Sequence, residues 1–285
     1  MREALAAALG EEVATLTPIA GGDLNDAFCA TLAGGSRAFV KTARDAAPGA
    51  YAAEAAGLRW LGEVGGLPVP EVLAVAERFL ALAWIEPGRE PLDAAALGRG
   101  LAQVHRAGAA APGALPPGVD GHRLILGPLA LPNDSAPSWP AFYAANRLLP
   151  LARMAADRGA LDPPGVRAIE AVAARIDALA GPDEPLARLH GDLWSGNVHA
   201  GAGGRPWLID PAAYGGHREV DLAMLSLFGG PARAFGAAYD EVWPRAAGHE
   251  ERTGLWQLFP LLVHAALFGG SYGASVERAA VRYVT

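Results

Sequence analysis

The chain has 285 residues, of which 52% are hydrophobic and 19% charged, and its formal net charge is −7. This much apolar material can form a large buried core and favours two lobes over one small domain. The acidic balance, with no long basic run, argues against nucleic acid as the main partner. Cys29 is the only cysteine, so an intrachain disulfide is excluded, which fits a reducing compartment.

The first 90 residues predict a β-rich lobe with one inserted helix. Residues 1–9 read as a short helix. Short apolar pieces between residues 13 and 42 are separated by glycine pairs, which is typical of turns in an antiparallel meander. Apolar residues at spacings of three and four predict a helix over residues 51–64. Two further strands are expected, over residues 71–76 and 79–85.

After residue 88 the chain becomes rich in alanine and leucine, which predicts a larger helical lobe. The helices expected there cover residues 93–107, 139–158, 164–180, 221–229 and 250–270. Residues 111–137 hold many prolines and glycines, so no regular structure is predicted there. Residues 186–210 are predicted to form short strands within the helical lobe. The predicted fold class is therefore α+β and bilobal, with a small β-rich lobe over residues 1–86 and a helical lobe over residues 87–285.

Neither secretion nor a membrane span is expected. The first residues lack a cationic region followed by a long apolar run. The most apolar late stretch, residues 258–270, is short of the roughly 20 residues that a spanning helix needs, so it reads as a buried helix. The sequence therefore predicts a cytoplasmic protein, with a monomer favoured.

The segment LHGDLWSGNV, residues 189–198, carries the most chemical information. His-Gly-Asp followed by Asn197, five residues after Asp192, has the spacing of the kinase catalytic loop H-x-D-x-x-x-x-N. Asp210 comes later, after a glycine-rich stretch flanked by short apolar runs. These runs predict a hairpin that would bring Asn197 and Asp210 to the same end.

Phosphoryl transfer explains these residue types, because it needs a positioned nucleophile and neutralised phosphate oxygens. Asp192 can orient an acceptor hydroxyl and take its proton. Asn197 and Asp210 offer the hard oxygen ligands that Mg²⁺ prefers. The alternative is a loop in which Asp192 caps a helix or turn. The ordered set favours the kinase interpretation, with ATP and Mg²⁺ as cofactors.

A second feature lies upstream, where the apolar strand RAFVK ends in Lys41 and Glu54 follows in the next predicted helix. In kinases such a lysine holds the α- and β-phosphates, and a helix glutamate pairs with it. Most lysines at strand ends are simply solvated. The position of Lys41 upstream of the Asp/Asn/Asp set favours the phosphate role.

Gly21, Gly22 and Asn25 belong to a turn that would lie above the phosphates, since glycines allow close backbone approach. The turn lacks G-x-G-x-x-G and the Walker pattern, so an ordinary hairpin turn stays an alternative. Asp23, in the same turn, is expected at a solvent edge or facing metal. Leu82–Glu86 would make the hinge between the lobes, and Glu86 and its neighbours would contact adenine through backbone groups.

The motif LHGDLWSGN, followed by IDPAAYGGHREVDLAM and LFGG, resembles the fructosamine kinase (ketosamine 3-kinase) family within the aminoglycoside phosphotransferase-like group. The similarity covers about residues 17–270, and Trp194 separates this family from other phosphotransferases. The resemblance implies a bilobal protein-kinase-like fold that uses ATP and Mg²⁺. It also implies phosphorylation of a sugar hydroxyl, usually O3, on a ketosamine, after which the unstable product releases the amine.

The resemblance also implies residue roles. The positions that match the family's phosphate anchor, lysine partner, base and metal ligands are Lys41, Glu54, Asp192, Asn197 and Asp210. Trp194 is similar to a loop tryptophan that faces the sugar, with packing between the lobes as the alternative. Of the family's Thr-Pro-Gln-x-Asn segment only Pro132-Asn133 matches, which leaves the acceptor open. Asp221 is expected to cap or anchor the next helix.

Two other classes of function stay open. One is a kinase for a different small hydroxyl compound, such as an aminoglycoside, choline or homoserine. The other is a non-catalytic nucleotide-binding module, against which the complete set of Lys41, Asp192, Asn197 and Asp210 argues. The chain after Asp210 passes quickly into a predicted helix and shows no activation loop, so protein substrates of the protein-kinase kind are disfavoured.

Overall fold

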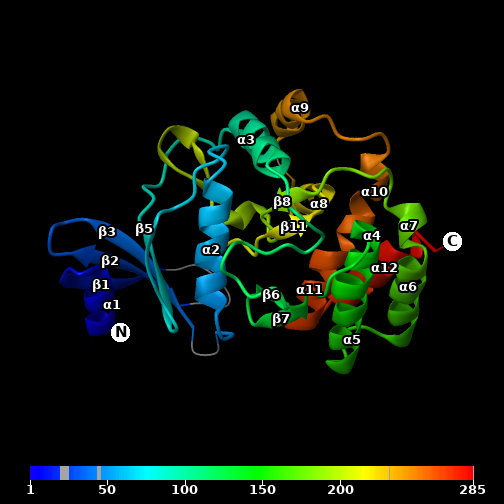
Figure 1. The fold of residues 1–285 in the computed structure, drawn as a ribbon, viewed down its shortest axis with the longest axis horizontal. Coiled ribbons are helices and arrows are strands. Elements are labelled where there is room, and N and C mark those ends of the chain that lie inside the picture. Colours follow the sequence, from blue (N-terminus) through cyan, green and yellow to red (C-terminus); the bar gives the residue numbers. More distant parts are fainter. Residues whose placement is uncertain (20–25, 44–45, 231, 285) are drawn as a thin grey trace.

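The structure, a computed structural model, describes residues 1–19, 26–43, 46–230 and 232–284. Its N-terminal part is built on a five-stranded antiparallel sheet with the order β1-β2-β3-β5-β4. The elements are α1 (Arg2–Leu9), β1 (Val13–Ile19), β2 (Asp26–Leu32), β3 (Arg37–Thr42), α2 (Ala50–Gly62), β4 (Val72–Ala76) and β5 (Phe79–Ala83). Helix α2 stands between this sheet and the helical part of the molecule (Figure 1).

Strand β3 is flanked on both sides in the sheet, and its alternating side chains contact two different cores. Ala38 and Val40 are buried in the cluster that includes Leu5 of α1. Phe39, on the opposite face, packs against the cluster that α2 contributes. Successive side chains of a strand point to opposite faces. Lys41 therefore lies on the α2 side of the sheet, which is where Glu54 is located.

The C-terminal part is mainly helical and buries the most extensive apolar cluster among the described residues. Its helices are α3 (Ala94–Arg106), α4 (Trp139–Tyr143), α5 (Leu149–Asp157), α6 (Pro163–Ala174), α7 (Ile176–Leu179), α8 (Glu219–Leu227), α9 (Arg233–Val242), α10 (His249–Trp256), α11 (Leu258–Phe268) and α12 (Tyr272–Val281). A π-helical segment, Ala144–Leu148, joins α4 to α5. Figure 1 shows these helices gathered on the side of α2 that faces away from the sheet.

Two short strand pairs carry the segments that contain Asp192 and Asp210. Strand β8 (Ala187–Leu189) pairs with β11 (Tyr214–Gly216), and β9 (Val198–Ala200) pairs with β10 (Pro206–Leu208), both antiparallel. Residues 190–197 connect β8 to β9, and residues 209–213 connect β10 to β11. Because both connections run from one strand pair to the other, the His-Gly-Asp segment and Asp210 lie together.

The predicted α+β fold, with its β-rich N-terminal and helical C-terminal parts, is confirmed, as is the hairpin after Asn197. The single helix expected over residues 250–270 was wrong, because the chain forms α10 and α11 with a break at Gln257. Residues 111–137 contain an unexpected hairpin of β6 (Arg123–Leu126) and β7 (Leu129–Pro132). Helices α9 and α12 were also not predicted.

The place of α9 depends on a glycine in another helix. A Cβ atom at Gly98 of α3 would lie 2.3 Å from the backbone oxygen of Phe235 in α9, so only glycine permits this approach. Such a contact between segments more than 130 residues apart has no local signature in the sequence.

None of the helices in the described residues is long and apolar enough to cross a lipid bilayer. The apolar stretch that begins at Leu258 forms α11, whose residues Leu258–Val263 are all buried.

Candidate active site

Lys41 lies at the junction between the sheet and the helical part. Its Nζ is 2.5 Å from Glu54 Oε2 and 3.0 Å from Asp210 Oδ1, and the residue is only 5% exposed. Burial by itself lowers the pKa of a lysine, but the carboxylates of Glu54 and Asp210 outweigh that effect and raise the pKa of Lys41 above its usual value. The site therefore keeps a positive charge between two acidic side chains that come from different parts of the chain.

Asp210 has an unusual backbone conformation. With a φ of 54°, it is the one non-glycine residue in the left-handed region among those that the structure describes. Aspartate tolerates this region better than most residues, and such strain is concentrated at functional sites. The preceding residue, Ile209, donates its backbone N–H to Asn197 O at 3.1 Å. The predicted meeting of Asn197 and Asp210 at one end of the hairpin is thus confirmed.

Asn197 fixes the orientation of Asp192. Its Nδ2 donates to the backbone oxygen of Asp192 at 2.8 Å and to Asp192 Oδ2 at 3.0 Å. Burial raises the pKa of Asp192 to about 7, and the nearby carboxylates of Asp210 and Asp221 act in the same direction. The Asn197 hydrogen bond and Lys41 oppose this shift. Asp192 is therefore a constrained carboxyl group whose proton affinity suits proton transfer near neutral pH.

The glycine of the His-Gly-Asp motif is required by close packing. Gly191 has a φ of 81°, and a Cβ atom there would lie 2.0 Å from the backbone oxygen of Ala212. The neighbouring His190 donates from Nε2 to Ile209 O at 2.9 Å. This histidine therefore ties the loop that carries Asp192 to the residue before Asp210.

Asp221, in the first turn of α8, binds the loop that carries Asp192. Its carboxylate accepts the backbone N–H groups of His190 at 2.7 Å and Gly191 at 3.0 Å. It also lies 3.2 Å from His105 Nε2. Burial disfavours its charge, but these hydrogen bonds, with that of His105 the strongest, hold the pKa of Asp221 below its usual value. Asp221 therefore anchors α8 to the loop that carries Asp192, so the expected anchoring is confirmed, whereas its carboxylate binds that loop and His105 and does not cap the helix.

His105 and Tyr239 complete this arrangement, although the sequence analysis assigns no role to either. His105 is fully buried on α3, and its Nδ1 is 2.8 Å from the hydroxyl of Tyr239 on α9. The series of hydrogen bonds from Tyr239 through His105 to Asp221 thus links α9 and α3 to the loop that carries Asp192. The one sequence signal was a histidine on the apolar face of a predicted helix, which more often marks simple core packing.

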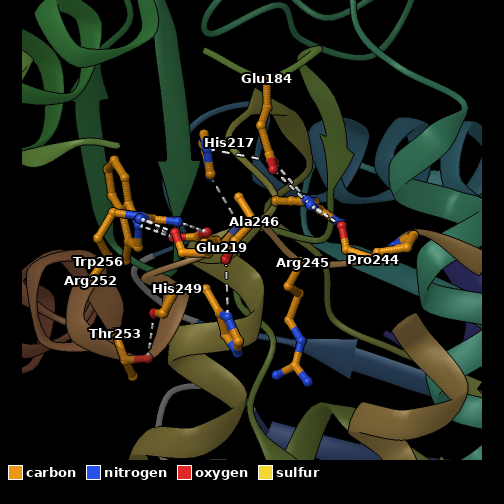
Figure 2. Close-up of polar contacts among 12 residues, drawn as sticks. Glu184, His217, Glu219, Pro244, Arg245, Ala246, His249, Arg252, Thr253 and Trp256 are labelled. Atoms are coloured by element: carbon orange, nitrogen blue, oxygen red, sulfur yellow. Dashed lines mark hydrogen bonds and ion pairs between the residues drawn. The ribbon is translucent and has the colours of Figure 1, made fainter. Parts of the chain in front are cut away.

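Two ion pairs fix the start of α8, next to Asp221. Arg218 donates to both oxygens of Glu184, each at 2.7 Å. Arg252 of α10 donates to both oxygens of Glu219, at 2.7 and 3.0 Å, and Trp256 Nε1 adds a third hydrogen bond at 2.8 Å. Figure 2 shows Glu219 enclosed by Arg252 and Trp256. Paired in this way, the buried charges make the position of α8 specific.

Trp194 lies two residues beyond Asp192 and is 39% exposed. Its ring meets that of Phe228 edge to face, with the centroids 6.3 Å apart. Trp194 is therefore partly open to solvent, and the ring that it contacts belongs to the helical part of the molecule.

The remaining sequence candidates are less fully defined. Gly21, Gly22 and Asn25, together with Asp23, lie outside the described residues. The Glu86 side chain forms an ion pair with Arg37 at the surface. Just after it, Gly88 donates its N–H to Ala200 O at 2.8 Å, which ties the hinge to the β9–β10 hairpin.

The donor set suits Mg²⁺ better than a transition metal. Within the described ranges no group of three or more histidine, cysteine or acidic side chains could hold a metal ion. Mg²⁺ commonly takes only one or two protein oxygens and completes its shell with water and phosphate. Asn197 uses its Nδ2 on Asp192, so its side-chain oxygen is the group that would bind a metal ion, and the Asp210 carboxylate comes from the residue after Ile209, which binds Asn197 through the backbone. These two hard oxygen groups fit a magnesium ion that a nucleotide shares.

A family model described as fructosamine kinase matches residues 1–285. The chain belongs to the fructosamine kinase family. A Thermus thermophilus protein named as a probable ketoamine kinase is 37% identical over 269 residues, which cover 92% of this chain and 91% of that protein. A chloroplastic protein-ribulosamine 3-kinase of Oryza sativa subsp. indica is 33% identical over 276 residues, which cover 93% of this chain and 77% of that protein.

Solved structures agree with the family. A Thermobifida fusca protein, provisionally named a fructosamine-3-kinase, matches with a TM-score of 0.88 and 44% identity over 99% of this chain and 98% of that one. A macrolide 2'-phosphotransferase of Brachybacterium faecium has a TM-score of 0.57 at 19% identity, over 98% and 95% of the two chains. At that identity the similarity shows only a shared fold, the bilobal phosphotransferase fold expected for a fructosamine kinase.

Proposed function

We propose that this member of the fructosamine kinase family transfers the γ-phosphoryl group of ATP to a sugar hydroxyl of a ketosamine, a fructosamine or a ribulosamine. The observation that carries the proposal is the junction where Lys41 pairs with both Glu54 and Asp210 while Asn197 holds Asp192 beside them. The names of the Thermus and rice relatives support the acceptor class. Release of the amine from the phosphorylated product would make the reaction a deglycation.

Each residue has a defined task in this proposal. Asp192, oriented by Asn197, accepts the proton of the acceptor hydroxyl as that oxygen attacks phosphorus. Lys41 stays charged and holds phosphate oxygens, while Glu54 keeps its ammonium group in place. Asn197 and Asp210 are the residues that would hold Mg²⁺. When bound, the magnesium–ATP complex supplies the phosphoryl group and neutralises the charge on its oxygens.

The acceptor class is tested by incubating the protein with ATP and Mg²⁺ and with single candidate acceptors, followed by mass spectrometry of the products. We expect phosphorylated product from fructosyl-lysine or ribulosyl-lysine. Choline, homoserine and an aminoglycoside serve as the rival acceptors. Turnover of one of these rivals, with neither ketosamine phosphorylated, would overturn the ketosamine assignment while leaving a small-molecule kinase.

Asp210→Asn should weaken the binding of magnesium–ATP by about 10–100-fold, since a hydrogen bond or contact to a charged group contributes roughly 1.5–3 kcal/mol. The substitution keeps the size of the side chain and removes the charge that faces both Lys41 and the metal. Isothermal titration with ATP in the presence of Mg²⁺ measures the effect. The matched control is Asp240→Asn, which removes the charge of a carboxylate on α9 that forms an ion pair with Arg245. Equal affinities for both variants and the wild type would contradict metal binding by Asp210.

The pH dependence follows from the pKa of Asp192. Only the ionised carboxylate can accept a proton, and its pKa is raised from 3.8 to about 7, so it is mostly protonated in mildly acidic solution. The value of kcat/KM for the acceptor should therefore rise about tenfold per pH unit below neutrality and level off above it. A carboxyl with the ordinary value would instead give a flat profile between about pH 5.5 and 8.5. Such a flat profile would contradict the raised pKa of Asp192, whereas its role as the base is tested by substitution.

A further inference from the structure

Aromatic side chains form a connected surface that starts at the catalytic loop. Trp194 meets Phe228, the residue that ends α8, and Phe228 meets His264 of α11 with ring centroids 5.1 Å apart. His264 in turn contacts Phe268 at 5.6 Å and Tyr272 at 5.0 Å. These five residues are called the aromatic surface below. It extends from the segment that carries Asp192 across α8 and α11 to α12 (Figure 1).

The aromatic surface is unusually exposed for residues of this kind. Trp194 and Phe228 are each 39% exposed, and Phe268 is 48% exposed. Seven large apolar side chains are exposed in the described part of the chain, and these three are connected by ring contacts that pass through His264. Single exposed apolar residues are ordinary, whereas a contiguous group next to a site marks a binding surface.

Internal contacts hold the aromatic surface in shape. His264 lies at its centre, with its Nδ1 2.7 Å from Pro260 O. Because a carbonyl oxygen can only accept, Nδ1 carries the proton, and this hydrogen bond fixes the ring. At the other end, Trp194 N donates to Asp192 O at 3.2 Å, which fixes the Trp194 backbone beside Asp192, and the indole itself packs against Phe228. A ligand would therefore meet aromatic rings that are already oriented.

The chemistry of the aromatic surface suits one end of a ketosamine better than the other. Sugar hydroxyls need hydrogen-bonding groups, whereas ring faces favour carbon chains, other rings and cations. The secondary amine of a ketosamine is cationic near neutral pH, and its substituent is a carbon chain or ring. None of the five residues carries an acidic or a strongly basic side chain, so the surface would not repel that cation.

We propose that the aromatic surface beyond Trp194, formed by Phe228, His264, Phe268 and Tyr272, binds the amine part of the ketosamine and selects acceptors with large apolar substituents. This proposal rests on the proposed function and adds the specificity for the amine carrier. A sugar hydroxyl placed at Asp192 would leave the rest of the acceptor to extend past Trp194. Binding energy from that remote part would then contribute to kcat/KM.

The test compares two acceptors that share fructose and differ in the amine, one derived from methylamine and one from benzylamine. Wild-type protein should have the higher kcat/KM with the benzylamine derivative. Phe228→Ala and Phe268→Ala should each reduce the ratio of the two kcat/KM values by about tenfold, through KM for the larger acceptor. Phe228→Tyr keeps the ring and should retain most of the preference. The matched control is Leu73→Ala, which truncates an apolar side chain of similar exposure on β4 and should leave the ratio unchanged.

The outcomes separate this inference from the function on which it rests. Equal kcat/KM values for the two acceptors in the wild type, or equal losses for both acceptors in Phe228→Ala, would overturn the amine-binding role alone. Failure of the wild type to phosphorylate either of these acceptors or ribulosyl-lysine would overturn the ketosamine kinase function, and the amine-binding role with it. A thermal melt of each variant identifies any that lose activity by unfolding, and Phe228→Tyr then provides the decisive comparison.

Discussion

Asp192→Asn should lower kcat by about 10²–10⁴-fold, the usual contribution of a general base. The substitution preserves the size of the side chain and leaves an oxygen to accept from Asn197 Nδ2, which in the wild type lies 3.0 Å from Asp192 Oδ2. What is lost is the ability to take a proton from the acceptor hydroxyl. Steady-state phosphorylation of a ketosamine at saturating ATP measures the effect.

The binding of magnesium–ATP should survive this substitution, because Lys41, Glu54 and Asp210 are untouched. A variant that binds the nucleotide normally and turns over slowly separates the loss of a base from the loss of the fold. Asp240→Asn again serves as the control for removal of a carboxylate elsewhere. Full activity in Asp192→Asn would refute the role of the base. A wild-type protein that binds ATP but transfers no phosphate to any acceptor would favour the non-catalytic alternative.

Asp221→Ala should lower the free energy of unfolding by about 2–4 kcal/mol, because it leaves buried donors without an acceptor and each such donor costs roughly 1–3 kcal/mol. The donors are the backbone N–H groups of His190 and Gly191, and the side chain of His105 loses its partner as well. Since these groups lie in or against the loop that carries Asp192, kcat should fall even in the fraction that stays folded. Urea denaturation followed by tryptophan fluorescence gives the change in stability.

Asp221→Asn should be compared with Asp221→Ala for its loss of stability. An asparagine keeps one acceptor oxygen and can serve only one of the two backbone N–H groups, so its loss of stability should be smaller than that of alanine. If the two variants unfold at the same urea concentration as the wild type, Asp221 does not hold the loop. Asp134→Ala provides the surface control, since the contacts of that residue with Asn146 use only its backbone.

The sequence predicted which candidate site residues lie together, because the chemistry of phosphoryl transfer dictates both residue type and spacing. The interval from Asp192 to Asn197 is local, and the asparagine reaches back over that loop to the aspartate. The pairing of Lys41 with Glu54 was also predictable, since the alternation along one strand and the following helix place both on the same side of the sheet. Trp194 is partly exposed, and its substrate-facing role stays a prediction.

Other parts of the site could not be read from local pattern. Asp221 follows the segment that carries Asp210 in the chain, and its place in the first turn of a helix gives a capping role the strongest local support. Its actual partners, His190 and His105, are 31 and 116 residues away in sequence. The close approach of α9 to Gly98 likewise joins segments that are far apart in sequence. Such contacts are decided by which surfaces meet after folding.

The amino-acid sequence by itself determined the fold class and the fructosamine kinase family, and it predicted the groups that we propose transfer the phosphoryl group. These depend on hydrophobic periodicity and on residue types at short, fixed intervals. Only the tertiary structure decided that Asp221 and His105 hold the catalytic loop, and that Phe228 and His264 continue the exposed ring of Trp194. The physical reason is that a buried hydrogen bond or a ring contact depends on distance in space, and chain segments far apart in sequence acquire that proximity only when the core packs.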